Sequence, residues 1–220
     1  MAAVEIFADA DALASALADQ LAAATRVLGA HVMLAGGRTP RAAYALVARG
    51  ADAAHLWFSD ERMVPADHAD SNYGMVRDAW LTRVGYPAAR VHRIAGERGA
   101  EVAAADASDE LRALAGDAPG LDLVVLGVGA DGHTASLFPG DAGATAPGLF
   151  VPARAGARVS AGLDLLRRAR RVVVVATGAE KATMVGDLLA GRRPDLPAAM
   201  VLGPTATWLL DLQASRGLER

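Results

Sequence analysis

The sequence of 220 residues contains no cysteine, and this absence excludes disulfide bonds as a source of stability. Disulfides are typical of small secreted proteins, so we expect a cytoplasmic protein. No apolar run has the length of roughly 20 residues that spanning a membrane requires. The first residues, MAAVEIFADADAL, carry acidic side chains where a secretory signal peptide carries positive charge. We therefore expect neither a membrane protein nor a secreted one.

A cluster of basic residues is also absent from the sequence. The formal net charge is −3, the basic residues are scattered, and Lys181 is the only lysine in the sequence. Binding of nucleic acid or of an anionic membrane needs clustered basic residues, so we expect neither partner. Small molecules are the better class of partner. With 53% hydrophobic residues we expect a single domain over residues 1–220, as a monomer or a weak homo-oligomer.

Short apolar runs that stop at glycine or polar residues predict an α/β fold. The run at 121–126 has no polar face, which is typical of a parallel strand that helices bury on both sides. Similar strands are predicted at 31–35, 55–58, 91–94 and 171–177. Apolar spacing and capping residues predict helices from Asp9 or Asp11 to Val27, from Pro40, from Ser71 to Leu81, and over 101–114 and 178–189. Residues 140–158, rich in Gly, Ala and Pro, predict an irregular excursion.

The stretch LGVGADGHTASLFPG follows the run at 121–126 and concentrates chemically active residues. Gly127, Gly129 and Gly132 allow sharp turns and close approach to a ligand, and they deliver Asp131 and His133 at the exit of a strand. The glycine spacing formally matches the dinucleotide fingerprint. However, the helix and the second strand with an acidic residue that this fingerprint requires are not evident. We therefore predict an acid–base role for His133, with a hydrogen-bonded structural histidine as the alternative.

A further segment places glycine and charged residues after the predicted strand at 31–35. Gly36, Gly37, Arg38 and Thr39 precede Pro40, which opens a helix, and this order favours an anion site at a helix N-terminus. An ordinary strand-to-helix turn is the equal alternative. It is not a Walker motif, because no Gly-Lys-Ser/Thr follows.

Charged residues also follow the strand at 55–58. Asp60, Glu61 and Arg62 would face the same crevice as the glycine turns, with Asn72 reaching it from the next helix; a solvated charged loop is the alternative.

Lys181 stands in the first turn after the strand at 171–177. Because the chain otherwise uses arginine, this lysine indicates a point-charge role, against the alternative of a chance surface lysine.

Together these motifs resemble the 6-phosphogluconolactonases over nearly the whole chain. The matching blocks are Gly36 to Pro40, Asp60-Glu61-Arg62 with Ser71-Asn72, Leu126 to Pro139, and Gly178-x-x-Lys181-Ala182. Glucosamine-6-phosphate deaminases of the same superfamily resemble it less. Where they have a carboxylate that supports ring opening this chain has Phe138, and where they usually have Tyr after Asp-Glu it has Arg62.

The resemblance implies a doubly wound, mostly parallel α/β sheet with helices on both faces, and hydrolysis of 6-phospho-D-glucono-1,5-lactone without metal or cofactor. His133 would be the general base, Asp131 its orienting partner and Arg62 an oxyanion donor, with Gly129 and Gly132 beside them. Arg38, Thr39, Lys181 and Arg158 would hold the phosphate with the turn at Gly36 and Gly37, and Asp60, Glu61 and Asn72 would complete the pocket. Ser136 as a nucleophile is the rival mechanism, although it lacks a nucleophile-elbow context. The rival functions are a sugar-phosphate deaminase or isomerase and a non-catalytic sugar-phosphate binder.

Overall fold

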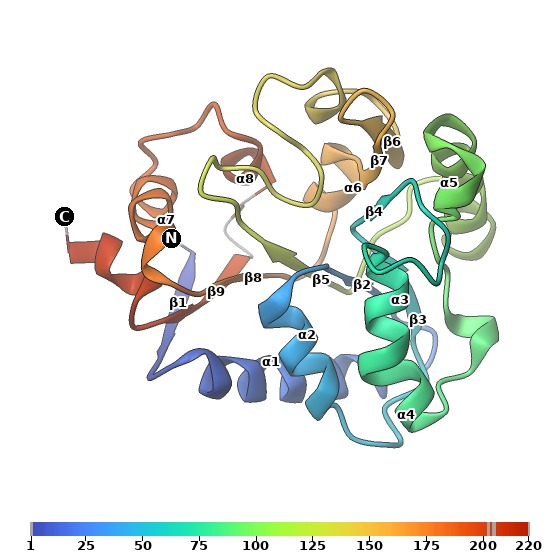
Figure 1. Ribbon diagram of the computed structural model, residues 1–220, viewed down its shortest axis with the longest axis horizontal. Helices are drawn as coiled ribbons and strands as arrows, with labels where there is room; N and C mark the ends of the chain where they lie inside the picture. Colours follow the sequence, from blue (N-terminus) through green and yellow to red (C-terminus); the bar gives the residue numbers. More distant parts are fainter. Residues whose placement is uncertain (1, 202, 204–205, 220) are drawn as a thin grey trace.

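A computed structural model describes residues 2–201, 203 and 206–219, and its centre is a sheet of six parallel strands (Figure 1). The strands lie in the order β1-β9-β8-β5-β2-β3. Their bounds, in the same order, are Ala3–Phe7, Ala206–Asp211, Val172–Ala176, Leu123–Gly127, His31–Leu34 and His55–Phe58. Every neighbouring pair is parallel, which confirms the predicted class of sheet.

Helices cover both faces of this sheet. In Figure 1, α1, α2 and α3 lie below the sheet, and α6 and α8 lie above it. The α-helices are α1 Ala10–Thr25, α2 Arg38–Leu46, α3 Asn72–Val76, α4 Thr82–Val84, α5 Ala100–Ala115, α6 Leu163–Arg167, α7 Ala182–Leu189 and α8 Pro197–Val201. All five residues of β8 are buried, because helices exclude water from both of its faces. None of the described helices has the length and apolar character needed to cross a membrane.

A second, smaller sheet was not predicted from the sequence. It contains three antiparallel strands in the order β4-β7-β6, with bounds Asp60–Arg62, Arg158–Ala161 and Phe150–Ala153. The charged segment after β3 is therefore a strand rather than a solvated loop. The excursion predicted at 140–158 is irregular at its start and ends in the β6–β7 hairpin.

Two predicted elements differ from the structure. The strand predicted at 91–94 is wrong, since only Val91 forms an isolated bridge, to Leu56, and the chain then turns into a 3₁₀-helix, Gly96–Arg98. The helix predicted from Ser71 to Leu81 begins correctly, because the Ser71 hydroxyl caps α3. It continues as a π-helical segment, Arg77–Leu81, before α4. Further 3₁₀ turns span Ala88–Arg90, Ala142–Ala144, Ala179–Lys181 and Ala214–Glu219.

The order of the strands fixes where a ligand can bind. After β2 the chain moves outward to β3, whereas after β5 it moves to β8 on the opposite side. The neighbouring strands β2 and β5 therefore form the switch point of the sheet. In open α/β sheets a crevice opens at this point, outside the carboxyl ends of the strands.

Candidate active site

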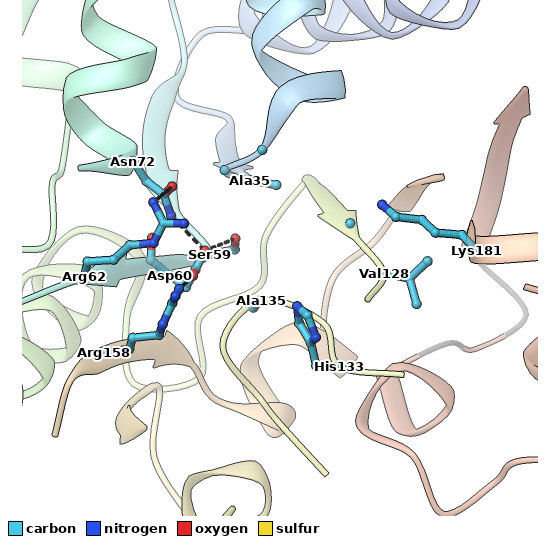
Figure 2. A pocket seen from close by; sticks show the side chains of 13 residues that line it. Ala35, Ser59, Asp60, Arg62, Asn72, Val128, His133, Ala135, Arg158 and Lys181 are labelled. Carbon is cyan, nitrogen blue, oxygen red and sulfur yellow. Dashed lines mark hydrogen bonds and ion pairs between the residues drawn. The ribbon is translucent and has the colours of Figure 1, made fainter. Parts of the chain in front are cut away.

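A polar cavity of about 210 Å³ lies at this switch point. Residues that follow β2, β3 and β5 line it, together with Lys181 beyond β8 and Arg158 at the start of β7. Figure 2 shows His133 on one wall of the cavity, Lys181 on one side of it, and Arg62, Arg158 and Asp60 grouped on the other side. The sheet thus assembles residues that are far apart in the chain.

His133 is paired with Asp131 within the loop after β5. Its Nδ1 lies 2.6 Å from Asp131 Oδ1, and its backbone N–H donates to the same oxygen at 3.2 Å. Burial acts to raise the pKa of Asp131, but the hydrogen bonds from His133 outweigh it and lower the pKa below its ordinary value. Asp131 is therefore an ionised acceptor, so Nδ1 must carry the proton of a neutral ring. The lone pair then remains on Nε2.

The loop needs glycine at two positions to hold this pair. A Cβ at Gly129 would lie 2.1 Å from His133 Nδ1 and 2.5 Å from Asp131 Oδ1, so any side chain would displace the pair. Gly132 has φ +83°, and a Cβ there would meet the Leu196 side chain at 2.4 Å. The carbonyl of Gly132 also accepts a hydrogen bond from the backbone of Ala198, at 3.1 Å, which ties the loop to α8.

Phe138 packs on His133, with their ring centroids 4.4 Å apart. The guanidinium carbon of Arg154 lies 4.2 Å from the centre of the Phe138 ring. Phe138 was singled out in the sequence only because glucosamine-6-phosphate deaminases have a carboxylate at this position. In the structure, Phe138 supplies an apolar wall beside the histidine, and Arg154 is a neighbour that no motif indicated.

Asp60 lies at the centre of the side of the cavity away from Lys181, and only 7% of its surface is exposed. Its Oδ2 accepts a hydrogen bond from the Ser136 hydroxyl at 2.7 Å and lies 3.7 Å from Arg158 Nη1. Its Oδ1 accepts from Asn72 Nδ2 at 3.0 Å. Ser136 is 0% exposed and its hydroxyl proton is committed to Asp60. A buried hydroxyl of this kind cannot reach a substrate, so the geometry opposes the rival mechanism.

Arg62 and Arg158 are directly opposite each other in the β4–β7 ladder. Like charges in such a cross-strand pair are destabilising unless something compensates. Burial first, and then the nearby charge of Arg62, lower the pKa of Arg158, while Asp60 acts in the opposite direction. Arg62 Nη1 donates to Asn72 Oδ1 at 3.0 Å. Two arginines held together at a cavity wall form a site for an anionic or developing negative charge.

The glycine turn after β2 is held from beneath by Tyr44. The Tyr44 hydroxyl donates to the carbonyl of Ala35 at 2.8 Å and accepts from its N–H at 3.0 Å. Gly37 has φ +104° and is the N-cap of α2. Within the described part of the chain, no side chain caps α2, whereas Asp9 caps α1 and Ser71 caps α3. The first turn of α2 is thus left able to bind an anion.

Lys181 borders the main cavity and also an adjoining hollow that Arg38 and Thr39 line. Burial first, and then the nearby charge of Arg38, lower the pKa of Lys181, while Glu180 raises it. The Thr39 hydroxyl lies 2.8 Å from that of Thr177, which joins the start of α2 to the end of β8. Lys181 and the glycine turn at Gly36 and Gly37 line the same cavity.

The predicted site residues therefore fall into three groups. His133, Lys181, Arg62, Arg158, Asp60, Asn72, Gly36 and Gly37 line the main cavity. Gly129, Gly132 and Asp131 support His133 from behind, and Arg38 and Thr39 line the adjoining hollow. Arg158 lies with Arg62 rather than with Lys181 (Figure 2). Glu61 is 2% exposed and does not contribute to the cavity wall.

Among the residues that the structure describes, no three His, Asp or Glu side chains lie close enough together to hold a metal ion. The cavity wall is instead rich in hydrogen-bond donors.

The chain belongs to the family described as glucosamine-6-phosphate isomerases/6-phosphogluconolactonase, which matches residues 8–209. It is 37% identical to the 6-phosphogluconolactonase of Homo sapiens over an alignment 238 positions long, which covers 97% of this chain and 92% of the relative. The family resemblance indicated by the motifs is thereby confirmed.

Solved structures agree with this assignment. The crystal structure of the devB protein has a TM-score of 0.90 and 33% identity, covering 98% of this chain and 99% of that one. A monomeric glucosamine-6-phosphate deaminase has a TM-score of 0.83 at 20% identity, covering 98% of this chain and 99% of that one. The second likeness shows the fold alone, so the chemistry must be argued from the residues of the site.

Proposed function

We propose that the protein hydrolyses 6-phospho-D-glucono-1,5-lactone to 6-phospho-D-gluconate. The observation that carries the proposal is the His133–Asp131 pair, in a cavity with cationic side chains at two separate places. The substrate has its reacting carbonyl at one end and its phosphate at the other, which suits such a cavity. The 6-phosphogluconolactonase named among the relatives supports the same activity.

In the proposed reaction His133 acts as a general base. Its Nε2 takes a proton from water while the water oxygen bonds to the lactone carbonyl carbon. Arg62 donates hydrogen bonds to the oxyanion that forms. When the intermediate collapses, the bond from the carbonyl carbon to the ring oxygen breaks, and the proton on His133 passes to that oxygen. Asp131 keeps Nδ1 protonated and stabilises the imidazolium that exists between the two transfers.

We assign the phosphate to the side of the cavity that holds Lys181. The uncapped first turn of α2, with Gly36 and Gly37, offers backbone N–H groups there, and Lys181 adds a point charge. Arg38 and Thr39 extend this positive region into the adjoining hollow. Arg158 lies beside Arg62, so in this arrangement it acts on the lactone end rather than on the phosphate.

The alternative chemistry of the family is deamination with ring opening. It needs a carboxylate where this chain has Phe138, and the Phe138 ring packs 4.4 Å from the His133 ring instead. An apolar wall cannot transfer a proton to a ring oxygen. This contact favours the lactonase over the deaminase.

Three measurements test the proposal against both alternatives. The lactone is generated in situ from glucose 6-phosphate, and its decay is followed with and without the protein. A catalysed decay supports the lactonase. Decay at the spontaneous rate with intact binding of 6-phosphogluconate would identify a non-catalytic binder, and release of ammonia from glucosamine 6-phosphate would identify a deaminase.

Gly129→Ala should impair catalysis while the protein stays folded. The new methyl group would lie 2.1 Å from His133 Nδ1, so the ring must leave its position beside Asp131. Since misplacement of a reacting group by about 1 Å can cost up to 10²-fold, we expect kcat to fall at least about tenfold. The affinity for 6-phosphogluconate should change little. Gly120→Ala provides a control for the general cost of alanine at a glycine, because its φ is not positive and a Cβ there would meet only the Arg168 carbonyl, at an ordinary 3.8 Å.

The affinity for 6-phosphogluconate should fall as the pH rises toward the ordinary pKa of lysine. The pKa of Lys181 is lowered by burial, so the side chain loses its charge below the ordinary lysine value of about 10.4. The dissociation constant, measured by calorimetry, should then rise by at most about tenfold per pH unit. Lys181→Arg should show a flat profile over the same range, because arginine stays protonated. Parallel profiles in the two proteins would remove Lys181 from the phosphate site.

A further inference from the structure

Glu61 is a fully buried carboxylate for which the proposed chemistry has no direct use. It is 2% exposed and points away from the cavity that its neighbours Asp60 and Arg62 line. A buried carboxylate is costly unless hydrogen bonds compensate for the lost hydration. What this carboxylate binds therefore indicates what it does.

The two oxygens of Glu61 accept four hydrogen bonds. Oε1 accepts from the backbone N–H of Arg62 at 2.8 Å and from that of Asn72 at 2.7 Å. Oε2 accepts from the Ser71 hydroxyl at 3.0 Å and from the backbone N–H of Tyr73 at 2.8 Å. One side chain in β4 thus binds both its own strand and the first turn of α3.

A single oxygen of Glu61 fixes both residues of the arginine–asparagine pair. The backbones of Arg62 and Asn72 meet at Oε1, and their side chains meet again through Arg62 Nη1 and Asn72 Oδ1, at 3.0 Å. Asn72 Nδ2 in turn donates to the Asp60 carbonyl and carboxylate, at 2.9 and 3.0 Å. Both side chains line the cavity. A shift of α3 against β4 would therefore turn Arg62 and Asn72 together.

We propose that Glu61 is a positioning residue that sets the direction of the Arg62 guanidinium by locking α3 to β4. This inference rests on the proposed lactonase activity, in which Arg62 stabilises the oxyanion. An oxyanion donor acts in the transition state, so its misplacement lowers kcat and leaves ground-state binding nearly unchanged.

The electrostatics of Glu61 agree with this role. Burial raises its pKa, and the hydrogen bonds from Tyr73, Asn72, Arg62 and Ser71 act against that rise. Glutamine at this position keeps the shape of the side chain but replaces one accepting oxygen by an NH₂ group. Whichever oxygen the NH₂ group replaced, it would face a hydrogen-bond donor, because both oxygens of Glu61 accept from N–H or O–H groups.

The test compares Glu61→Gln in two backgrounds. In the otherwise wild-type protein, Glu61→Gln should lower kcat about tenfold or more, with KM for the lactone and the dissociation constant of 6-phosphogluconate within about twofold. In the Arg62→Ala background the same change should lower kcat by less than about twofold, because the group that Glu61 positions is gone. Equal losses of kcat in the two backgrounds would overturn the proposal, as would a loss confined to KM.

Two further variants guard against a simple loss of stability. Thr25→Val removes a buried hydrogen bond to the carbonyl of Leu21 in α1, far along the chain from this site, and should lower the melting temperature without changing kcat. If Glu61→Gln does not fold, Ser71→Ala removes one of the four donors, together with the side-chain cap of α3, and leaves the carboxylate in place. It should lower kcat a few-fold, and only when Arg62 is present. An inactive wild type would instead refute the lactonase assignment, so the two failures are distinguishable.

Discussion

His133→Ala is expected to lower kcat for lactone hydrolysis by 10²–10⁴-fold, which is roughly the contribution of a positioned general base. Water at the carbonyl then lacks a proton acceptor, while Arg62 and the phosphate contacts persist. The dissociation constant of 6-phosphogluconate should stay within a few-fold of wild type, since base and phosphate site are separate groups. Stopped assays with in situ lactone, corrected for spontaneous hydrolysis, give the ratio. An unchanged kcat would exclude the general-base role.

Asp131→Asn is the matched companion to this variant. Asparagine keeps the size of the side chain but carries no charge and offers an amide that can donate to Nδ1. Because Asp131 Oδ1 lies 2.6 Å from Nδ1 in the native protein, the exchange would favour the tautomer with its proton on Nε2. In this tautomer Nε2 cannot accept a proton from water. We expect kcat to fall substantially with little change in binding, whereas an unaffected kcat would mean that Asp131 has no part in the tautomer choice.

The strands that surround the site could be predicted because helices bury them on both faces. β2, β3, β5 and β8 are largely apolar runs. The first three end at residues that line the cavity, and β8 ends at Thr177 and Gly178, which line the adjoining hollow. The exits of parallel strands meet at one edge, so the sequence alone predicts that four separate motifs share one crevice.

The strands that were missed lack this pattern. The residues of β1 are exposed or half-buried, and β1 pairs with β9 alone, so it leaves no buried run in the sequence. β9 is a short apolar stretch of the kind that periodicity cannot assign to a strand or to a helix. In the β6–β7 hairpin, Pro152 and the turn at Gly156 conceal the alternation of apolar and polar residues. The predicted strand at 91–94 fails because Gly96 packs against the backbone of Arg62, which draws the chain away from β3.

The residue types of the site were predictable, but their partners were not. The pairing of Asp131 with His133 could be expected from their closeness in the chain. The ion pair of Asp60 with Arg158 joins residues about a hundred positions apart, through a sheet that the sequence did not indicate. The role of Glu61 was hidden for the same reason, because its partners become neighbours only when α3 packs against β4.

Lys181→Ala is expected to raise KM for the phosphorylated lactone and to change kcat much less. The phosphate lies far from the reacting carbon, so its contacts are common to the ground state and the transition state. Loss of one charge-assisted hydrogen bond costs about 1.5–3 kcal/mol, or roughly ten- to a hundredfold in kcat/KM. Lys181→Arg should recover only part of this loss, because the planar guanidinium cannot occupy the same point beside the turn at Gly36 and Gly37.

The unphosphorylated gluconolactone separates a phosphate anchor from a residue that merely maintains the fold. Wild type and Lys181→Ala should hydrolyse it about equally poorly, because neither can use a phosphate contact. A second control is Arg192→Ala, which removes an exposed cation paired with Asp187 at the end of α7 and should leave KM for the phosphorylated lactone unchanged. If Lys181→Ala lost as much activity on the unphosphorylated lactone as on the phosphorylated one, the role of Lys181 would be structural. The phosphate would then have to be assigned to the side of the cavity that holds Arg62 and Arg158.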